Sequence, residues 1–408
     1  MKIFRTQFWS VCLGNLFEHY DTALFGFLSP FLAPLFFPKH EPLTALILTY
    51  AIIPLGMLMR PLGALFFGYV GDVYGRGRAL FFSLLGMGCF SFCMALAPTF
   101  EQVGVFAPIF LCLVRLGQNF LAAGEIMGGA ILLLEETPEK KHDWLSSLYS
   151  ASTIGGILLA AFGVSFLCQM SSVESAWRTL YVAGGITAFF GCLLRKKNNL
   201  SREKKPLSDI GKTLWQYHRL IGSIAIAAGF SYASYSVALV LMNGLIPLVT
   251  TMTKESVIQL NTGLLVLDFT LLPLCGWISS KISRERLMII ASLCSALCAI
   301  PLFLLLDKST LMTIVGVRVC FVLMGAAFSA PLHAWAQSRV PENHRYLVIS
   351  FGYALGSQLL GGPTTAISLW LFKQTGMVAS VCWYWMALAL ASAFIILKGE
   401  ALKKPVPS

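Results

Sequence analysis

Apolar stretches of about 20 residues recur along the whole chain, and this repetition constrains the fold more than any other feature. Each stretch is long enough to cross a bilayer as a helix. The hydrocarbon core offers no water to backbone N–H and C=O groups, so such stretches must be helical. Of the 408 residues, 57% are apolar and 12% are charged, whereas soluble domains average about 45–50% apolar and about 25% charged residues. An ordinary soluble domain is therefore excluded.

The stretches predict an all-α membrane protein with twelve transmembrane helices in two six-helix lobes. The expected spans are 8–37, 44–70, 79–98, 103–134, 144–170, 177–194, 216–249, 257–280, 287–306, 310–338, 345–372 and 379–398. The first span is too long for the apolar core of a signal peptide, and it carries Glu18 and Asp21 in its middle. We therefore expect it to be retained.

The net charge of +11 follows this topology. With a cytosolic N-terminus, Lys and Arg exceed Asp and Glu in the internal segments, whereas the external segments are balanced. This is the positive-inside pattern of an inner (cytoplasmic) membrane protein, and no nucleic-acid partner is expected. An even number of spans returns the C-terminus, with Lys398, Lys403 and Lys404, to the cytosol.

A basic polar stretch, Arg195–Gln216, divides the spans into two groups of six. It predicts an N-terminal lobe at 1–194, a cytoplasmic linker at 195–215 and a C-terminal lobe at 216–408. The halves repeat weakly, since three residues after the second span have counterparts after the eighth: Gly68, Arg76 and Arg78 correspond to Gly276, Arg284 and Arg286. Asp72 and Gly75 become Ser280 and Ser283. A parallel repeat is expected of a transporter whose substrate site lies between its lobes.

The loop after the second span, Gly68-x-x-x-Asp72-x-x-Gly75-Arg76-x-Arg78, carries a specific pattern. Gly68 permits close helix approach, Gly75 permits a tight turn, and Asp72 can accept hydrogen bonds from a helix N-terminus. The loop resembles the signature loop of the major facilitator superfamily. That resemblance implies twelve helices, alternating access around a central cavity, and a role for Gly68, Asp72, Gly75, Arg76, Arg78, Arg284 and Arg286 in conformational gating.

Five further segments resemble the metabolite–proton symporter family, whose members carry dicarboxylates, citrate, shikimate, proline or betaines. They are Gly14-Asn15-x-x-Glu18-His19-Tyr20-Asp21, Arg60-Pro61-Leu62-Gly63, Arg115-x-x-Gln118 with Gly124-Glu125, Glu135-Glu136-x-Pro138, and Gly352-Tyr353 with Gly361-Gly362-Pro363-Thr364. The chain departs from the family pattern at Asn119, Ile126 and Ala354, where Gly, Tyr and Asn are usual.

Ionisable residues inside the spans are costly in hydrocarbon, so each must face a cavity or another charge. The candidates are four acids, Glu18, Asp21, Glu125 and Asp268, and three arginines, Arg60, Arg115 and Arg318. The count leaves at least one acid without its own arginine, and such an acid takes up and releases a proton readily. The four acids are candidate proton carriers, while Arg115 and Arg318 are candidate structural charges.

Glu18 and Asp21 lie three residues apart and share a face of the first helix. His19 and Tyr20 follow Glu18 in the sequence, and we expect their side chains to point away from the two acids. Because two nearby carboxylates resist double ionisation, this pair favours holding a proton.

Arg60 is the main candidate for binding a substrate carboxylate. It lies twelve residues before Asp72, about 18 Å up the helix and near mid-bilayer. A guanidinium at this depth can bind a carboxylate through two hydrogen bonds, and the family resemblance points to the same residue. Pro61 predicts a helix break there. At the offset that relates the halves, Arg60 corresponds to Asp268, so the two residues are also a candidate ion pair.

Tyr20, Tyr232, Tyr235 and Asn243 complete the candidate substrate-binding set, since aromatic rings can surround a quaternary ammonium and an amide can hydrogen-bond a polar group. The eleven cysteines include no CxxC pair and no neighbouring His cluster. We therefore expect no metal, no cofactor and no disulfide chemistry.

These features predict a secondary active transporter that takes up a small carboxylate-bearing metabolite with protons and works as a monomer in the lipid bilayer. An exchanger or exporter is the alternative within the same fold. An embedded enzyme needs a nucleophile, metal or phosphate-binding constellation, and a sensor needs a sizeable soluble domain. Neither feature is found in the sequence.

Overall fold

A computed structural model describes residues 2–38, 42–170, 173–196, 210–250, 252, 254–306 and 310–401. The described residues are almost entirely helical and contain no strand. Each of the twelve predicted spans falls on helix, as expected for backbone that must satisfy its own hydrogen bonds in lipid. Nine helical stretches in the described part of the chain are long and apolar enough to cross a bilayer. Most of the basic linker and the lysines at 403 and 404 lie outside the described residues.

The chain forms two compact units. Unit 1 comprises Met1–Glu136, Ser152–Thr213 and Glu342–Phe351, and unit 2 comprises Thr137–Ala151, Leu214–Pro341 and Gly352–Ser408. The division into two lobes that the sequence predicted stays a prediction.

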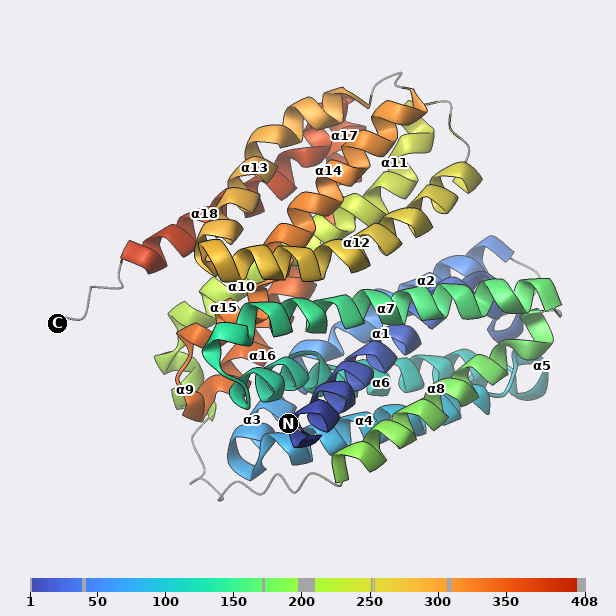
Figure 1. The fold of residues 1–408 in the computed structure, drawn as a ribbon. Coiled ribbons are helices and arrows are strands. Elements are labelled where there is room, and N and C mark those ends of the chain that lie inside the picture. Colours follow the sequence, from blue (N-terminus) through green and yellow to red (C-terminus); the bar gives the residue numbers. More distant parts are fainter. Residues whose placement is uncertain are drawn as a thin grey trace. The chain divides into compact units, whose positions relative to one another are not determined.

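Unit 1 is built on long helices that run side by side, with α1 between α6 and α8 (Figure 1). Its elements are α1 (Lys2–Phe36), α2 (Pro42–Met57), α3 (Met59–Tyr74), α4 (Arg76–Ala95), α5 (Phe100–Val103), α6 (Phe106–Glu135), α8 (Val173–Lys196), the second half of α7 (His142–Met170), most of α9 (Ile210–Gln216) and the first turns of α16 (Arg345–Leu355).

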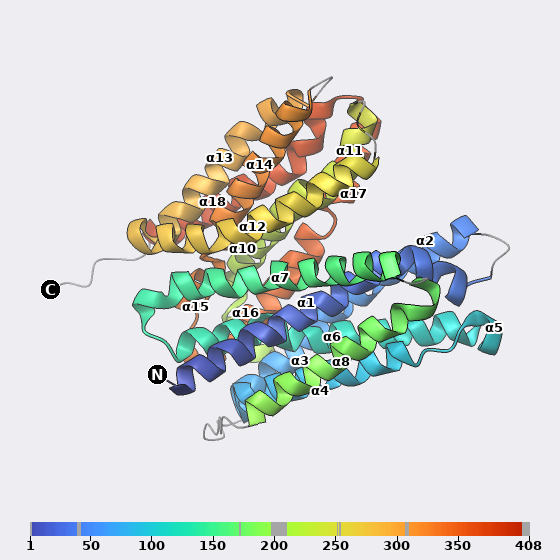
Figure 2. The same ribbon diagram turned by 45° about the vertical axis from the view of Figure 1, so that its right-hand side comes forward.

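In unit 2, α14 packs against both α12 and α13, as the turned view shows (Figure 2). Its main elements are the start of α7, α10 (His218–Tyr235), η2 (Ser236–Leu241), α11 (Met242–Val249), α12 (Lys254–Ile282), α13 (Arg284–Leu304), α14 (Leu311–Ser329), α15 (Leu332–Arg339), η4 (Gly356–Gly361), α17 (Thr364–Thr375), η5 (Val378–Cys382) and α18 (Trp383–Ala401).

The second span is broken, as Pro61 predicted, but the break lies at Leu58, between α2 and α3. Pro61 then falls in the first turn of α3, where a missing N–H costs no hydrogen bond. Pro54 lies inside α2, four residues before the break, and has no N–H to donate within that helix. The break places Arg60 at the N-terminal end of α3.

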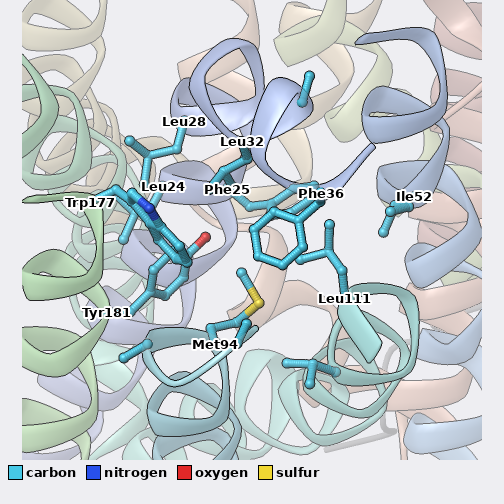
Figure 3. Packing of buried hydrophobic residues seen from close by; sticks show 14 of the residues in the cluster. Leu24, Phe25, Leu28, Leu32, Phe36, Ile52, Met94, Leu111, Trp177 and Tyr181 are labelled. Atoms are coloured by element: carbon cyan, nitrogen blue, oxygen red, sulfur yellow. The ribbon is translucent and has the colours of Figure 1, made fainter. Parts of the chain in front are cut away.

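The core of unit 1 is a cluster of large apolar side chains centred on α1 (Figure 3). Leu24, Leu28, Leu32 and Phe36 recur every four residues, so they form one stripe along α1, and all four are buried. Phe36 meets Trp177 of α8 edge to face, with ring centroids 5.9 Å apart. In lipid such close packing, rather than exclusion of water, holds neighbouring helices together.

Candidate functional site

Arg60 lies in a buried cluster contributed by three helices of unit 1. Its Nη2 atom lies 3.1 Å from Oε1 of Glu18 on α1, and its Nε donates to Oδ1 of Asn119 on α6 over 3.0 Å. Thr22 donates to the same Glu18 oxygen. Arg60 is 6% exposed and Glu18 is fully buried. The Arg60 guanidinium is therefore paired inside its own unit, with Glu18.

Asn119 is one of the three departures from the family pattern. Its amide oxygen accepts from Arg60, and its amide nitrogen donates to the backbone oxygen of Arg115 over 2.9 Å. A glycine at this position would leave the Nε of Arg60 without this acceptor. Asn119 therefore fixes the plane of the Arg60 guanidinium, which the usual glycine could not do.

His19 contacts Glu18 directly, so the expectation that its side chain points away from the acids is wrong. Its Nδ1 lies 2.5 Å from Oε2 of Glu18 and 2.9 Å from the backbone oxygen of Asn15. The ring turns back along α1 because the oxygen four residues earlier lies on the same face. The Glu18 carboxylate thus lies between a guanidinium and an imidazole that is 18% exposed.

Asp21 belongs to a different cluster, although it lies only three residues from Glu18. It pairs with Nη1 of Arg115 at 3.3 Å and accepts from Gln118 over 2.8 Å and from Ser91 over 2.5 Å. The guanidinium of Arg115 also lies 4.4 Å over the ring of Phe25. Asp21 therefore has three donors, one of which is its own arginine, and it does not share the arginine of Glu18.

Glu125 is paired with Arg195, a residue that the sequence assigned to the cytoplasmic linker. Both guanidinium nitrogens of Arg195 contact the carboxylate, and the arginine is only 7% exposed. It lies one residue past the predicted end of the sixth span, near the end of α8, and its long side chain folds back into the bundle. A side chain on Gly14 would collide with this pair, which explains the small residue there.

The three acids of unit 1 therefore each have an arginine. The sequence count of four acids against three arginines omitted Arg195. Among the described residues, the predicted acid that forms no ion pair is Asp268 of unit 2.

Arg318 of unit 2 is fully buried and, among the described residues, contacts no carboxylate. Its guanidinium donates to Oδ1 of Asn261, to Oδ1 of Asn243 and to the backbone oxygens of Ala238 and Val257. Ala238 lies in η2, a π-helical segment whose wider turns interrupt the usual backbone ladder. The distortion supplies a carbonyl that a regular helix would use internally, so neutral oxygens surround the charge.

Asp268 is 7% exposed and lies in the middle of α12. Within the part of the chain that the structure describes, no Arg, Lys or His forms an ion pair with it, and no donor is hydrogen-bonded to it. Tyr235 lies within electrostatic range of its carboxylate, and Tyr232 lies close to Tyr235. The candidate partner suggested by the repeat, Arg60, is held by Glu18 and Asn119 in unit 1.

The remaining predicted substrate ligands have different partners. The Tyr20 hydroxyl donates to the backbone oxygen of Leu180 over 3.0 Å, so it is engaged within unit 1. Asn243 is engaged by Arg318. Tyr232 and Tyr235 both lie on α10, and only Tyr235 is shown within electrostatic range of Asp268.

The signature loop lies against the start of α16 in unit 1. The Asp72 carboxylate accepts from the backbone N–H groups of Tyr346 and Leu347, over 3.2 and 2.9 Å, so the predicted contact with a helix N-terminus is present. Arg76 contacts Glu135, and Arg345 of α16 lies 2.8 Å from the same carboxylate. Gly68 lies so close to Leu347 that a side chain would clash with its backbone.

The corresponding loop of unit 2 keeps the shape of the signature loop but not its chemistry. Gly75 has φ of 105°, and its counterpart Ser283 has φ of 103°. Arg284 pairs with Asp143 of α7 at 2.9 Å and donates to the backbone oxygen of Ala334. Arg78 and Arg286 are both exposed. Arg284 therefore pairs with a carboxylate from another helix, as its counterpart Arg76 pairs with Glu135.

Comparison with known proteins gives concordant results. The family model described as Major Facilitator Superfamily matches residues 11–362. The glycine betaine/proline/ectoine/pipecolic acid transporter OusA of Dickeya dadantii is 25% identical over 439 residues, covering 98% of this chain and 84% of that protein. The α-ketoglutarate permease of Escherichia coli is 27% identical over 417 residues, covering 98% of this chain and 96% of that protein.

Solved structures share the fold. The proton:xylose symporter XylE superposes with a TM-score of 0.78 at 17% identity, covering 97% of this chain and 96% of that chain. The fucose:proton symporter FucP of Escherichia coli gives 0.72 at 14% identity, covering 98% of each chain. At these identities the likeness establishes the fold alone.

Proposed function

This chain belongs to the Major Facilitator Superfamily of membrane transporters, and from that premise we propose that it takes up a small carboxylate-bearing metabolite together with protons. The relatives are named for proline and betaines or for α-ketoglutarate, and all these compounds carry a carboxylate. The observation that carries the proposal is the cluster of Arg60, Glu18 and His19. In it, the Arg60 guanidinium can pair either with Glu18 or with the carboxylate of a substrate.

Competition for Arg60 supplies a coupling mechanism. In the structure Glu18 holds the guanidinium at 3.1 Å. A substrate carboxylate that binds Arg60 through two hydrogen bonds displaces Glu18. The displaced acid is buried without a cation and then favours its neutral form. One carboxylate and one proton therefore enter the cluster together, and its total charge does not change.

His19 is suited to deliver that proton. Its ring touches Glu18 and is partly exposed, and the two nitrogens of an imidazole can serve as a proton shuttle. Asp21 and Glu125 are less suited to the role, because each keeps an arginine that no competing ligand is proposed to remove. Among the predicted proton carriers of unit 1 we therefore assign the role to Glu18.

The protein is proposed to work as a monomer in the cytoplasmic membrane, with both termini in the cytosol and 1–194 and 216–408 as the alternating lobes. The distribution of Lys and Arg supports this orientation.

Purified protein in liposomes tests the function. A panel of labelled proline, glycine betaine, α-ketoglutarate, citrate and shikimate is offered with the interior alkaline, and again with equal pH on both sides. The proposal expects accumulation of at least one compound above its external concentration only with the pH gradient. Accumulation that instead requires substrate preloaded inside, regardless of pH, would show that the protein is an exchanger.

A further inference from the structure

Arg318 of α14 differs from Arg60 and Arg115, because none of its contacts in the described part of the chain is with an acid. Those two arginines pair with Glu18 and Asp21. Arg318 is fully buried and contacts four amide oxygens, two from side chains and two from the backbone. A guanidinium keeps its proton in proteins, so this side chain brings one positive charge into the interior of unit 2.

Amide oxygens stabilise a buried charge but do not cancel it. An ion in a low-dielectric interior is unfavourable unless an opposite charge lies close to it. The unpaired acid of the same unit, Asp268, follows Asn261 by seven residues, which places it two turns, or about 10 Å, farther along α12. Arg318 contacts Asn261 but not Asp268. The charge of Arg318 therefore calls for a counter-ion that the described chain does not provide.

The Arg318 guanidinium keeps hydrogen-bond donors for such an ion. Its Nη2 donates to Oδ1 of Asn243, to Oδ1 of Asn261 and to the backbone oxygen of Ala238, so both hydrogens of this nitrogen are used. Its Nη1 donates to one oxygen, that of Val257, over 3.3 Å. Its Nε is buried and has no hydrogen-bond partner among the described residues. The Nε–H and one N–H of Nη1 therefore remain available.

These donors suit a halide better than a carboxylate. A carboxylate binds a guanidinium through two parallel hydrogen bonds along one edge, which is formed either by Nη1 with Nη2 or by Nε with Nη2. Because Nη2 belongs to both edges and is already used, neither edge of Arg318 is open. A halide is a single atom that accepts an N–H from any direction, so it can bind at Nε alone. Chloride is the halide that biological media supply.

Two asparagines give an anion a route to the guanidinium. Asn243 of α11 and Asn261 of α12 both contact Arg318, and both are partly exposed. Their amide oxygens face the guanidinium, so their NH2 groups point the other way. The outer side of the cluster therefore presents N–H donors with a positive charge behind them, and such an arrangement attracts anions.

The contacts of Arg318 also show what a bound anion would stabilise. The side chain extends from α14 and bonds to α11, to α12 and to the π-helical segment η2. It is thus the common hydrogen-bond donor of a junction between four elements of unit 2. An anion that neutralises the guanidinium removes the electrostatic cost of this junction and leaves its hydrogen bonds in place.

We propose that Arg318, Asn243 and Asn261 form a chloride-binding site inside unit 2, and that bound chloride is the counter-ion that stabilises this unit. The inference goes beyond the proposed function, because it concerns neither the substrate nor the proton. The site lies entirely within unit 2 and can be tested without a transported compound.

Thermal melting of the purified protein tests the site. Chloride replaces gluconate stepwise at constant ionic strength and pH, for wild type and for three variants. Asn261→Asp places a carboxylate where an amide oxygen now contacts Arg318, so the counter-ion becomes part of the chain. Arg318→Gln removes the charge. Asn343→Asp is the control, because it makes the same amide-to-acid change at an exposed residue of unit 1.

We expect the melting temperatures of wild type and Asn343→Asp to rise with the logarithm of the chloride concentration, as they do when a ligand binds only the folded protein. Bromide should act in the same way. Asn261→Asp should melt higher than wild type in gluconate and should not respond to chloride. Arg318→Gln should also lose the response, and if it does not fold, Asn261→Asp decides the question.

The proposal is overturned if the wild-type melting temperature does not change with chloride, or if Asn261→Asp responds as strongly as wild type. A rise that is linear in concentration and equal in all four proteins is a general salt effect and also contradicts the site. An acetate series distinguishes the chemical class. If acetate stabilises wild type as much as chloride does, the site binds carboxylates and the chloride assignment is wrong. Uptake of carboxylates is tested separately by the liposome panel.

Discussion

At the scale of single residues, the behaviour of Arg60 distinguishes a ligand from a structural charge. Arg60→Lys keeps the charge but loses the planar fork that matches a carboxylate. The loss of a charge-assisted hydrogen bond costs about 1.5–3 kcal/mol, so substrate affinity should fall roughly ten- to a hundredfold. Equilibrium binding of the transported compound to the purified variant measures this change.

The opposite view is that Arg60 serves only to neutralise Glu18. In that case the double variant Arg60→Gln with Glu18→Gln, which removes both charges of the pair, should fold and bind substrate nearly as well as wild type. Normal binding by the double variant would show that the guanidinium is structural. We expect the double variant to fold but to bind no carboxylate.

Backbone conformation at Ser283 gives a second prediction at this scale. A non-glycine residue at φ of 103° is strained, and strain of this kind costs about 1–3 kcal/mol. Ser283→Gly should therefore raise thermal stability, less a few tenths of a kcal/mol for the lost cap to Arg286. The reverse change at the counterpart, Gly75→Ser, should lower it. A lower melting temperature for Ser283→Gly in detergent would contradict this account.

At the scale of elements, the contact between Asp72 and α16 is the clearest candidate for a conformational latch. The carboxylate caps the helix by accepting from two backbone N–H groups. Asp72→Asn keeps the size but replaces one acceptor oxygen with an NH2 group and removes the favourable charge at the helix N-terminus. We expect transport to fall severalfold while membrane insertion and substrate affinity change little.

Uptake rates and binding measured on the same preparation of Asp72→Asn test the latch. Its control is Glu139→Gln, which makes the same acid-to-amide change at an exposed residue outside the signature loop. Full transport activity of Asp72→Asn would show that the cap is not needed during the transport cycle.

At the same scale, the position of every span was predictable from the sequence, whereas the distortions inside spans were not. Twenty-residue apolar stretches specify helices because lipid allows nothing else at that length. The π-helical segments Ser236–Leu241 and Gly356–Gly361 have no comparable signal. They depend on contacts with other helices, such as Arg318 at Ala238 and Tyr384 at Leu360.

The sequence drew attention to the buried charged residues of the candidate site, but not to how they pair. Glu18, Arg60 and Asp268 stood out because charge is costly inside apolar stretches. Which arginine meets which acid depends on the side-by-side arrangement of helices far apart in sequence. Arg195 was missed because its side chain reaches back from one residue beyond the predicted span, and the contact of His19 with Glu18 was missed because neighbouring residues were assumed to diverge.

At the scale of the whole molecule, the orientation in the membrane follows from charge and can be measured. In a cysteine-free background, a cysteine at the exposed Gln102, before α6, should react with an impermeant reagent added to intact cells. A cysteine at the exposed Glu139, after α6, should react only once the membrane is opened. External labelling of the Glu139 position in intact cells would reverse the proposed topology.

The measurement that most directly tests the account is proton uptake on substrate binding. Purified protein in weakly buffered detergent solution with a pH indicator is mixed with the carboxylate compound that the uptake panel identifies. Competition for Arg60 predicts that wild type takes up protons as it binds, whereas Glu18→Gln binds the compound without taking up protons. Binding to wild type without proton uptake, or equal uptake by Glu18→Gln, would contradict the proposed coupling.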